Sequence, residues 1–170
     1  PIPAQGEFEF RTELHWLQIE PTGPVVAVCI DAMLGILSTS DDDPVAVAEL
    51  ICLVDREDIG LEIVRSLREK RINVLHTFGV GQTKNEKEAD GRRRKLAFFR
   101  GDAKVKVTTI QSFKGWENRA LVVQISGASD PTGLAVAYAA ITRLKQDDRG
   151  SFLTVICSAP QLREFGQAWQ

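Results

Sequence analysis

Short apolar runs alternate along the chain with longer segments whose apolar residues recur at helical spacing or whose composition is rich in alanine. The short runs are apolar throughout, which is typical of strands that are buried on both faces. Strands of this kind separated by helices predict a mainly parallel sheet with helices on both faces, a three-layer α/β fold. The predicted strands are 50–54, 72–75, 105–110, 120–125 and 152–157. The predicted helices are 25–37, 59–70, 92–100, 132–145 and 160–169.

The remaining segments are predicted to be an edge strand and loops. Residues 7–20 alternate in places between apolar and polar positions, so 1–24 is expected to be an N-terminal extension or an edge strand. The acidic stretch 38–44 and the polar stretch 79–91 are predicted to be loops. With 170 residues, 44% of them hydrophobic and 26% charged, the chain has the composition of a single globular domain over 1–170.

Composition also narrows the class of protein. The three cysteines lie in apolar runs, which predicts buried thiols rather than a disulfide framework or a zinc site. No apolar run approaches the roughly 20 residues needed to cross a bilayer, and no signal peptide is apparent, which predicts a cytoplasmic protein. The formal net charge of -2 excludes a strongly basic nucleic-acid coat but leaves room for a local basic strip. The chain begins with Pro on an unpatterned stretch, so we expect it to be a piece of a larger polypeptide.

A dense group of hydrogen-bonding residues follows the predicted strand 105–110. Ligand-binding residues gather at the carboxyl ends of the strands in such sheets. A glycine there lets backbone approach a ligand, a lysine supplies a point charge, and a carboxylate can accept from a sugar hydroxyl. The simpler alternative is a polar turn between two strands. The candidate residues are Thr108, Thr109, Gln111, Ser112, Lys114, Gly115 and Glu117.

A second candidate is Arg143, near the end of the Ala-rich helix predicted over 132–145. An arginine at this position can interact with the carboxyl end of its own helix and with solvent. Its planar guanidinium also suits a phosphate that arrives from a neighbouring domain, as arginine fingers do in phosphoryl transfer. The residue by itself leaves both interpretations open.

Taken in order, these segments resemble motifs of the superfamily 1 DNA helicases of the UvrD, PcrA and Rep type. Residues Thr109 to Glu117 (TIQSFKGWE) resemble motif V, T-x-H-x-x-K-G-L-E. Residues Ala137 to Arg143 (AYAAITR) resemble motif VI, L-Y-V-A-x-T-R, and a predicted strand lies between the two. The run Ile51 to Arg56 (ICLVDR) resembles motif IV, a strand that ends in an arginine, although Asp55 competes for that position.

The resemblance implies the C-terminal RecA-like motor domain of an ATP-dependent DNA helicase or translocase. It implies that Arg143 reaches the γ-phosphate, that Arg56 makes a second nucleotide contact, that Glu117 binds the ribose and that Gly115 lines the nucleotide pocket, with Lys114 supporting either surface. It further implies that Thr108, Thr109, Gln111 and Ser112 lie near the phosphates of single-stranded DNA. The implied cofactor is ATP, with magnesium held by the N-terminal RecA-like domain of the same parent chain. That domain and single-stranded DNA are the implied partners.

Departures from the family pattern set limits on this interpretation. Gln111 stands where the motif has His and cannot carry a positive charge, and Trp116 replaces the usual Leu. Only residues 76–104 separate the strands between which the family carries a large inserted domain. No G-x-x-x-x-G-K-[ST] loop is present, so the chain alone is predicted not to hydrolyse ATP. A regulatory or structural domain that keeps the fold without motor function remains the alternative.

Other conspicuous residues have structural interpretations. Arg92, Arg93, Arg94 and Lys95 either contact a nucleic-acid backbone or form a solvated helix face, and the neighbouring Phe98 and Phe99 favour the latter. Trp16 and Trp169 are expected to pack in a core or interface rather than to stack on bases. His15 and His76 lack the spacing of metal ligands and are expected to be structural.

Overall fold

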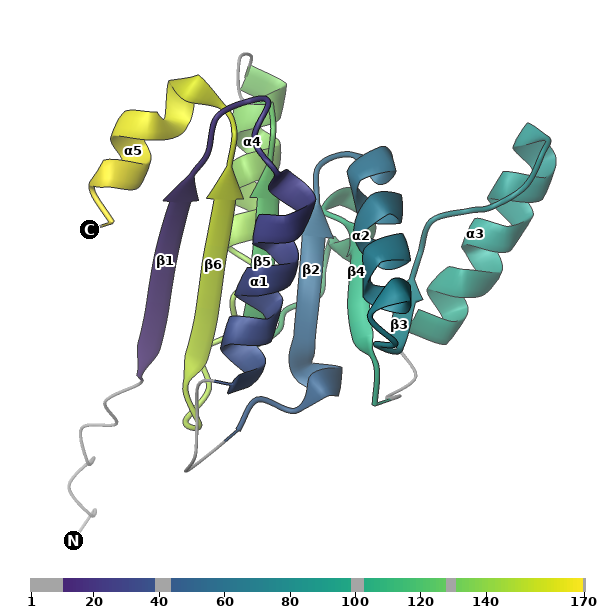
Figure 1. Cartoon of the computed structure of the whole chain (residues 1–170), viewed down its shortest axis with the longest axis horizontal. Coiled ribbons are helices and arrows are strands. Elements are labelled where there is room, and N and C mark those ends of the chain that lie inside the picture. The colour runs from purple at the N-terminus through teal and green to yellow at the C-terminus, as the bar shows by residue number, and fades with distance from the viewer. Residues whose placement is uncertain (1–10, 39–43, 99–102, 128–130, 170) are drawn as a thin grey trace, which may run out of the picture.

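A six-stranded parallel sheet with the order β1-β6-β5-β2-β4-β3 forms the centre of the molecule (Figure 1). The computed structural model describes residues 11–38, 44–98, 103–127 and 131–169. The strands are β1 (Thr12–Gln18), β2 (Leu50–Val54), β3 (Val74–His76), β4 (Val105–Thr109), β5 (Ala120–Ile125) and β6 (Ser151–Cys157). The predicted parallel α/β fold is confirmed. Because all strands run the same way, the sheet has a carboxyl edge, where every strand ends, and an amino edge, where every strand begins.

Helices cover both faces of this sheet and flank its sides (Figure 1). Helices α1 (Val25–Ser38) and α2 (Glu57–Glu69) lie on one face, and α4 (Pro131–Ile141) lies on the other. Helix α5 (Arg163–Gln167) packs against β1, whereas α3 (Lys84–Phe98) lies beside β3 at the opposite side. Short 3-10 turns occupy Val47–Glu49, Gln111–Phe113 and Pro160–Leu162. None of the described helices is long and apolar enough to cross a membrane.

Two apolar cores, one on each face, explain why the central strands are apolar throughout. Residues such as Cys29 and Leu67 join the sheet to α1 and α2, and Phe113 and Ala140 fill the opposite face. Every residue of β2, β5 and β6 is buried, since both of their faces are covered. The three cysteines are buried free thiols, as predicted. The packing prediction also holds for the two tryptophans Trp16 and Trp169, whose ring centroids lie 5.4 Å apart.

The structure corrects the prediction that 79–91 is a loop, because α3 begins at Lys84. A capping box forms the start of this helix: the Glu86 amide donates to Thr83 Oγ1 at 3.3 Å, and the Thr83 amide donates to Glu86 Oε2 at 3.0 Å. The signal Thr83-Lys-Asn-Glu86 was present in the sequence. It was obscured because no apolar stripe follows it, and of the described α3 side chains only Phe98 is buried.

Candidate functional site

The turn that follows β4 presents hydroxyl groups at the carboxyl edge. Thr109 Oγ1 donates to Ser112 Oγ at 2.9 Å, and the Ser112 amide donates to Thr109 Oγ1 at 3.2 Å. Phe113 is only 1% exposed, so its side chain anchors the turn in the core beneath. Gln111 is exposed at the surface of the same turn. Three of the four predicted DNA contacts therefore lie together on one short, internally bonded segment.

A groove of about 450 Å³ lies beside this turn, which we call the carboxyl-edge groove. Its far wall comes from α3, which contributes Arg92 and Lys95. Carboxylates are also present, because Glu57 of α2 and Glu88 of α3 line the same space. The groove is lined by Glu57, Thr77, Phe78, Gly79, Glu88, Gly91, Arg92, Lys95, Thr109, Gln111 and Ser112. It joins hydroxyl and amide donors to two cations, a combination that can bind a phosphate backbone.

The structure does not place Thr108 on this surface. Its side chain points into the molecule, where Thr108 Oγ1 lies 2.6 Å from Thr77 Oγ1, and the residue is 1% exposed. The hydroxyl of Thr108 therefore helps to join β4 to the segment after β3. Side chains alternate between the faces of a strand, and the sequence did not show which of two adjacent threonines would face outward. We correct the predicted set of DNA contacts by leaving Thr108 out.

The residues after β2 also lie at the carboxyl edge. Asp55 accepts a hydrogen bond from the Ser126 amide at 2.5 Å and one from Ser126 Oγ at 2.9 Å, which ties the end of β2 to the end of β5. Arg56 is exposed and donates from Nε to Asp58 at 3.1 Å. The hydrogen bond and charge of Asp58 raise the pKa of Arg56, and those of Arg56 lower the pKa of Asp58. Asp55 thus has a structural role.

The segment after the β4 turn crosses to the amino edge. Gly115 has a φ of 86°, in the left-handed region that residues with a side chain rarely adopt. Exposed Glu117 follows, and the next residue forms a parallel bridge with the chain beyond α4. In this bridge the Asn118 amide donates to the Arg143 carbonyl at 3.0 Å, and the Lys145 amide donates to the Asn118 carbonyl at 2.9 Å. These bonds place Glu117 and Arg143 next to one another at the amino edge.

Arg143 lies just beyond α4, which ends at Ile141. Its Nε donates to the Ala139 carbonyl at 3.0 Å, and its Nη2 lies 3.4 Å from Thr142 Oγ1. The guanidinium thus caps the carboxyl end of α4 and forms no ion pair with any residue that the structure describes. Exposed Glu117 and Lys114 are likewise unpaired within the described chain. A cation and a carboxylate at this edge are therefore available to an external ligand.

A partly buried ion-pair network next to these residues was not predicted. Glu49 Oε2 accepts from Arg119 Nη2 at 2.9 Å, and Glu49 Oε1 lies 2.9 Å from Arg149 Nη2. Burial raises the pKa of Glu49, but the hydrogen bonds from Arg119 and the Ala46 amide, with the charges of both arginines, lower it overall. Glu49 and Arg119 directly precede the paired residues Leu50 and Ala120, so the strand register brings them together. The sequence shows that Glu49 and Arg119 each precede an apolar run, but it does not show that the two strands pair.

The length of the strands separates the two groups of candidate residues. A strand rises about 3.3 Å per residue, so the six residues of β5 place the two edges about 20 Å apart. Glu117 and Arg143 lie at the amino edge, whereas Arg56, Thr109, Gln111 and Ser112 lie at the carboxyl edge. The prediction that Arg56 contacts the same nucleotide as Arg143 therefore conflicts with the topology. The sequence showed that Arg56 follows a strand, but not which edge faces the nucleotide.

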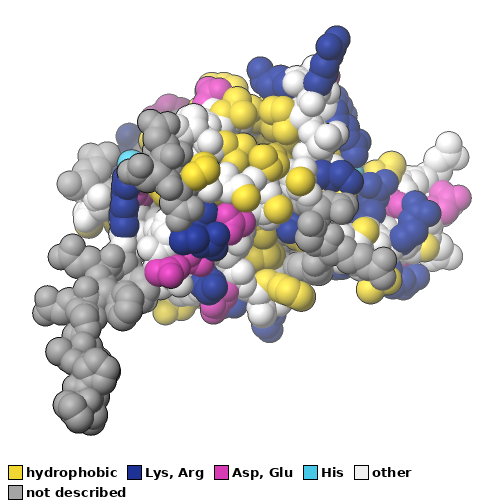
Figure 2. All heavy atoms as spheres, turned by 90° about the horizontal axis from the view of Figure 1, so that it is seen from below, with side chains coloured by type: hydrophobic (Ala, Val, Ile, Leu, Met, Phe, Trp, Pro, Cys, Tyr) yellow, Lys and Arg dark blue, Asp and Glu magenta, His cyan; other side chains and the backbone are white. Residues whose placement is uncertain are grey.

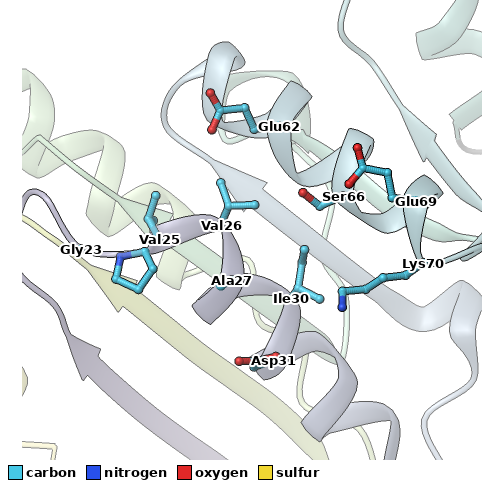
Figure 3. A pocket seen from close by; sticks show the side chains of 11 residues that line it. Gly23, Val25, Val26, Ala27, Ile30, Asp31, Glu62, Ser66, Glu69 and Lys70 are labelled. Carbon is cyan, nitrogen blue, oxygen red and sulfur yellow. The ribbon is translucent and has the colours of Figure 1, made fainter.

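Another hollow lies between α1 and α2 and has a volume of about 720 Å³ (Figure 3). Val26 and Ile30 line it together with the carboxylates of Asp31, Glu62 and Glu69. None of the candidate residues lines this hollow, so it is not part of the site described above. The described residues also contain no group of three or more His, Cys, Asp or Glu side chains placed to hold a metal ion.

The parallel sheet, the strand order and the helices on both faces define a RecA-like α/β fold, the fold of helicase C-terminal domains. One similar structure is the C-terminal domain of a possible DNA helicase from Lactobacillus plantarum, with a TM-score of 0.56 and 15% identity over 93% of this chain and 82% of that one. Another is Dbp5 of S. cerevisiae bound to RNA and ADP BeF3, with a TM-score of 0.53 and 14% identity over 94% of this chain and 38% of that one. No protein-family model and no curated protein matches the sequence.

Proposed function

We propose that the chain is the C-terminal motor domain of an ATP-dependent DNA helicase or translocase. The observation that carries the proposal is the bridge between Asn118 and the segment 143–145, which joins the end of the segment resembling motif V to the segment resembling motif VI at the amino edge. In a parent protein, an N-terminal RecA-like domain with ATP and magnesium would face this amino edge. Arg143 would then contact the γ-phosphate, and Glu117 would accept from the ribose hydroxyls.

The opposite edge supplies the proposed contact with single-stranded DNA. Thr109, Ser112 and Gln111 would donate to phosphate oxygens, whose contacts position a strand without reading its sequence. The chain contributes electrostatic stabilisation and supplies no nucleophile or general base, so hydrolysis would be a shared reaction of two domains. Opening and closing of the two domains would move the carboxyl edge along the strand.

Substitution of Arg143 by Ala in the full-length parent tests the proposal. Removing an arginine finger costs about 10³-fold or more in turnover, so DNA-stimulated ATPase activity should fall by that order. Arg163→Ala is the matched control, because Arg163 pairs with Glu20 at the far side of the molecule. Unchanged ATPase activity in the Arg143→Ala parent would refute the proposal.

The alternative is a regulatory or structural domain of the same fold. It is favoured by the hydrogen bond from Arg143 Nε to the Ala139 carbonyl, because a helix-capping arginine needs no phosphate partner. Under this alternative, Arg143→Ala lowers the stability of the end of α4 and leaves ATPase activity unaffected. Thermal unfolding and ATPase measurements on the same variant separate the two functions.

A further inference from the structure

Two hollows meet at His76, where β3 lies between α2 and α3 at the side of the sheet. Their volumes are about 670 Å³ and 240 Å³, and both are lined by His76 and Arg68. We call the two together the basic groove. Its charged lining residues are Arg65, Arg68, Glu69, Lys87, Arg93 and Arg94. Lys and Arg side chains gather on the side of the molecule that carries α2, β3 and α3 (Figure 2).

The basic groove has an excess of positive charge. Glu69 is its one lining carboxylate against five cations. Arg93 and Arg94 share Asp90, at 3.1 Å and 2.5 Å. The other three cations, Arg65, Arg68 and Lys87, form no ion pair with any residue in the described part of the chain. The groove therefore has unneutralised donors that come from two separate helices.

His76 supports the basic groove from inside the molecule. The residue is 3% exposed, and its Nε2 lies 3.1 Å from Arg94 Nη1. Because a guanidinium can only donate, Nε2 accepts and the imidazole proton resides on Nδ1. Burial lowers the pKa of His76 to about 4, and the charges of Arg94 and Arg68 lower it further than Asp90 raises it. A hydrogen bond with the Phe78 backbone acts in the opposite direction and raises this pKa. The ring is buried, so it supports Arg94 from inside the molecule and is not itself open to a ligand.

The neighbouring surface indicates what the cations of the basic groove bind. Gly79 lines both the basic groove and the carboxyl-edge groove, so the two lie next to one another. Phosphate oxygens bind arginine side chains in bidentate fashion. Resting on the proposed function, we propose that single-stranded DNA leaving the carboxyl-edge groove passes over Gly79 and binds the basic groove through its phosphates. The strand would contact Arg65, Arg68 and Lys87, the three cations of the groove that form no ion pair with a described residue.

The test compares the wild-type chain with Arg65→Gln/Arg68→Gln in binding fluorescent single-stranded DNA. Oligonucleotides of about 5 and about 15 nucleotides bracket the usual site sizes for single strands. The double variant should bind the longer strand about tenfold more weakly for each arginine lost. The slope of log affinity against log salt should become shallower by about 0.7 per phosphate contact. Arg11→Gln/Arg163→Gln removes the same charge from exposed pairs at the other side and should bind as wild type.

A second readout reports on the surface of the groove. The NMR signals of the backbone amides of residues 65–69 should shift when the longer strand binds and should not shift in Arg65→Gln/Arg68→Gln. Equal affinity of this variant and wild type, or no binding of the longer strand by wild type, overturns the inference. A shift caused by inorganic pyrophosphate but not by DNA also overturns it, because the groove then binds free phosphate. The proposed function is judged separately, by ATPase activity of the Arg143→Ala parent.

Discussion

At the scale of single residues, His76 shows how burial sets the charge of a side chain. The imidazole is held neutral because it lies beneath the surface beside Arg94 and Arg68, and its pKa is lowered from 6.5 to about 4. Its neutral form accepts from Arg94 and so helps to place α3 beside β3. Protonation would remove that acceptor and add a further positive charge to a region already rich in arginine.

We expect the free energy of unfolding to fall as the pH is lowered from about 6.5 to about 4. In this window the unfolded chain binds a proton at His76 that the folded chain does not, so stability increases with pH. The shift of His76 corresponds to about 3 kcal/mol, which is lost in full below pH 4. Urea denaturation at a series of pH values measures the effect.

The matched variant for this pH series is His76→Gln, which keeps an acceptor for Arg94 but cannot titrate. Its stability should lack the slope between pH 6.5 and 4. Asp90, whose pKa the hydrogen bond from Arg94 lowers to about 2, loses its contribution only between about pH 4 and 2. A slope that persists unchanged in His76→Gln between pH 6.5 and 4 would show that another group is responsible.

At the scale of elements, α3 is attached to the sheet through glycines. A Cβ on Gly79 would lie 2.0 Å from the Lys87 carbonyl oxygen, and one on Gly81 would lie 2.7 Å from Glu86 Cβ. The segment after β3 therefore approaches the first turns of α3 more closely than any side chain would allow. This close contact compensates for the small number of apolar side chains that α3 buries.

Gly79→Ala should therefore displace α3 and destabilise the chain by about 1–3 kcal/mol, the usual cost of an overpacked site. Hydrogen exchange measured by mass spectrometry should be faster in this variant than in wild type over Lys84–Phe98, with a smaller change over β5. Gly127→Ala is the control, because a Cβ there meets nothing within 4 Å. Wild-type protection of α3 in Gly79→Ala would contradict this account of how the helix is attached.

Elements that bury apolar side chains were predictable from sequence, and those held by polar contacts were not. Strands 50–54 and 120–125 were predicted with the bounds of β2 and β5, because a strand covered on both faces must be apolar throughout. Helix α3 was predicted only in its second half, since a capping box and glycine contacts define its start. Arg143 was assigned to a helix that ends two residues earlier.

At the scale of the whole molecule, the parallel sheet separates the proposed nucleotide and DNA contacts. The sequence indicated which residues follow strands, but not the strand order β1-β6-β5-β2-β4-β3 or the edge to which each loop leads. For this reason Arg56 was grouped with Arg143, although about 20 Å of sheet lies between them. The bridge between Asn118 and the segment 143–145 brings the two segments that resemble motifs V and VI into contact, but the roles of Glu117 and Arg143 stay predictions.

Variants at the two edges of the parent protein should therefore have separable effects. Glu117→Gln should raise the KM for ATP by about tenfold or more, because a charge-assisted hydrogen bond to the ribose is lost. Its Kd for single-stranded DNA without nucleotide should not change. Ser112→Ala should weaken DNA binding and leave the KM for ATP at saturating DNA unchanged. Loss of both activities in either single variant would contradict the assignment of one ligand to each edge.

The two edges are nevertheless connected by one short run of chain, residues 109–118. It begins at the hydroxyl turn, passes the left-handed Gly115 and ends at the amide that is bonded to the Arg143 carbonyl. If the proposed DNA strand displaced the turn, the displacement would reach the arginine through covalent bonds and one hydrogen bond. The coupling between nucleotide binding and DNA binding would then depend on the stiffness of residues 109–118. Glycine is the most permissive residue, so a stiffer residue at position 115 would alter this coupling most.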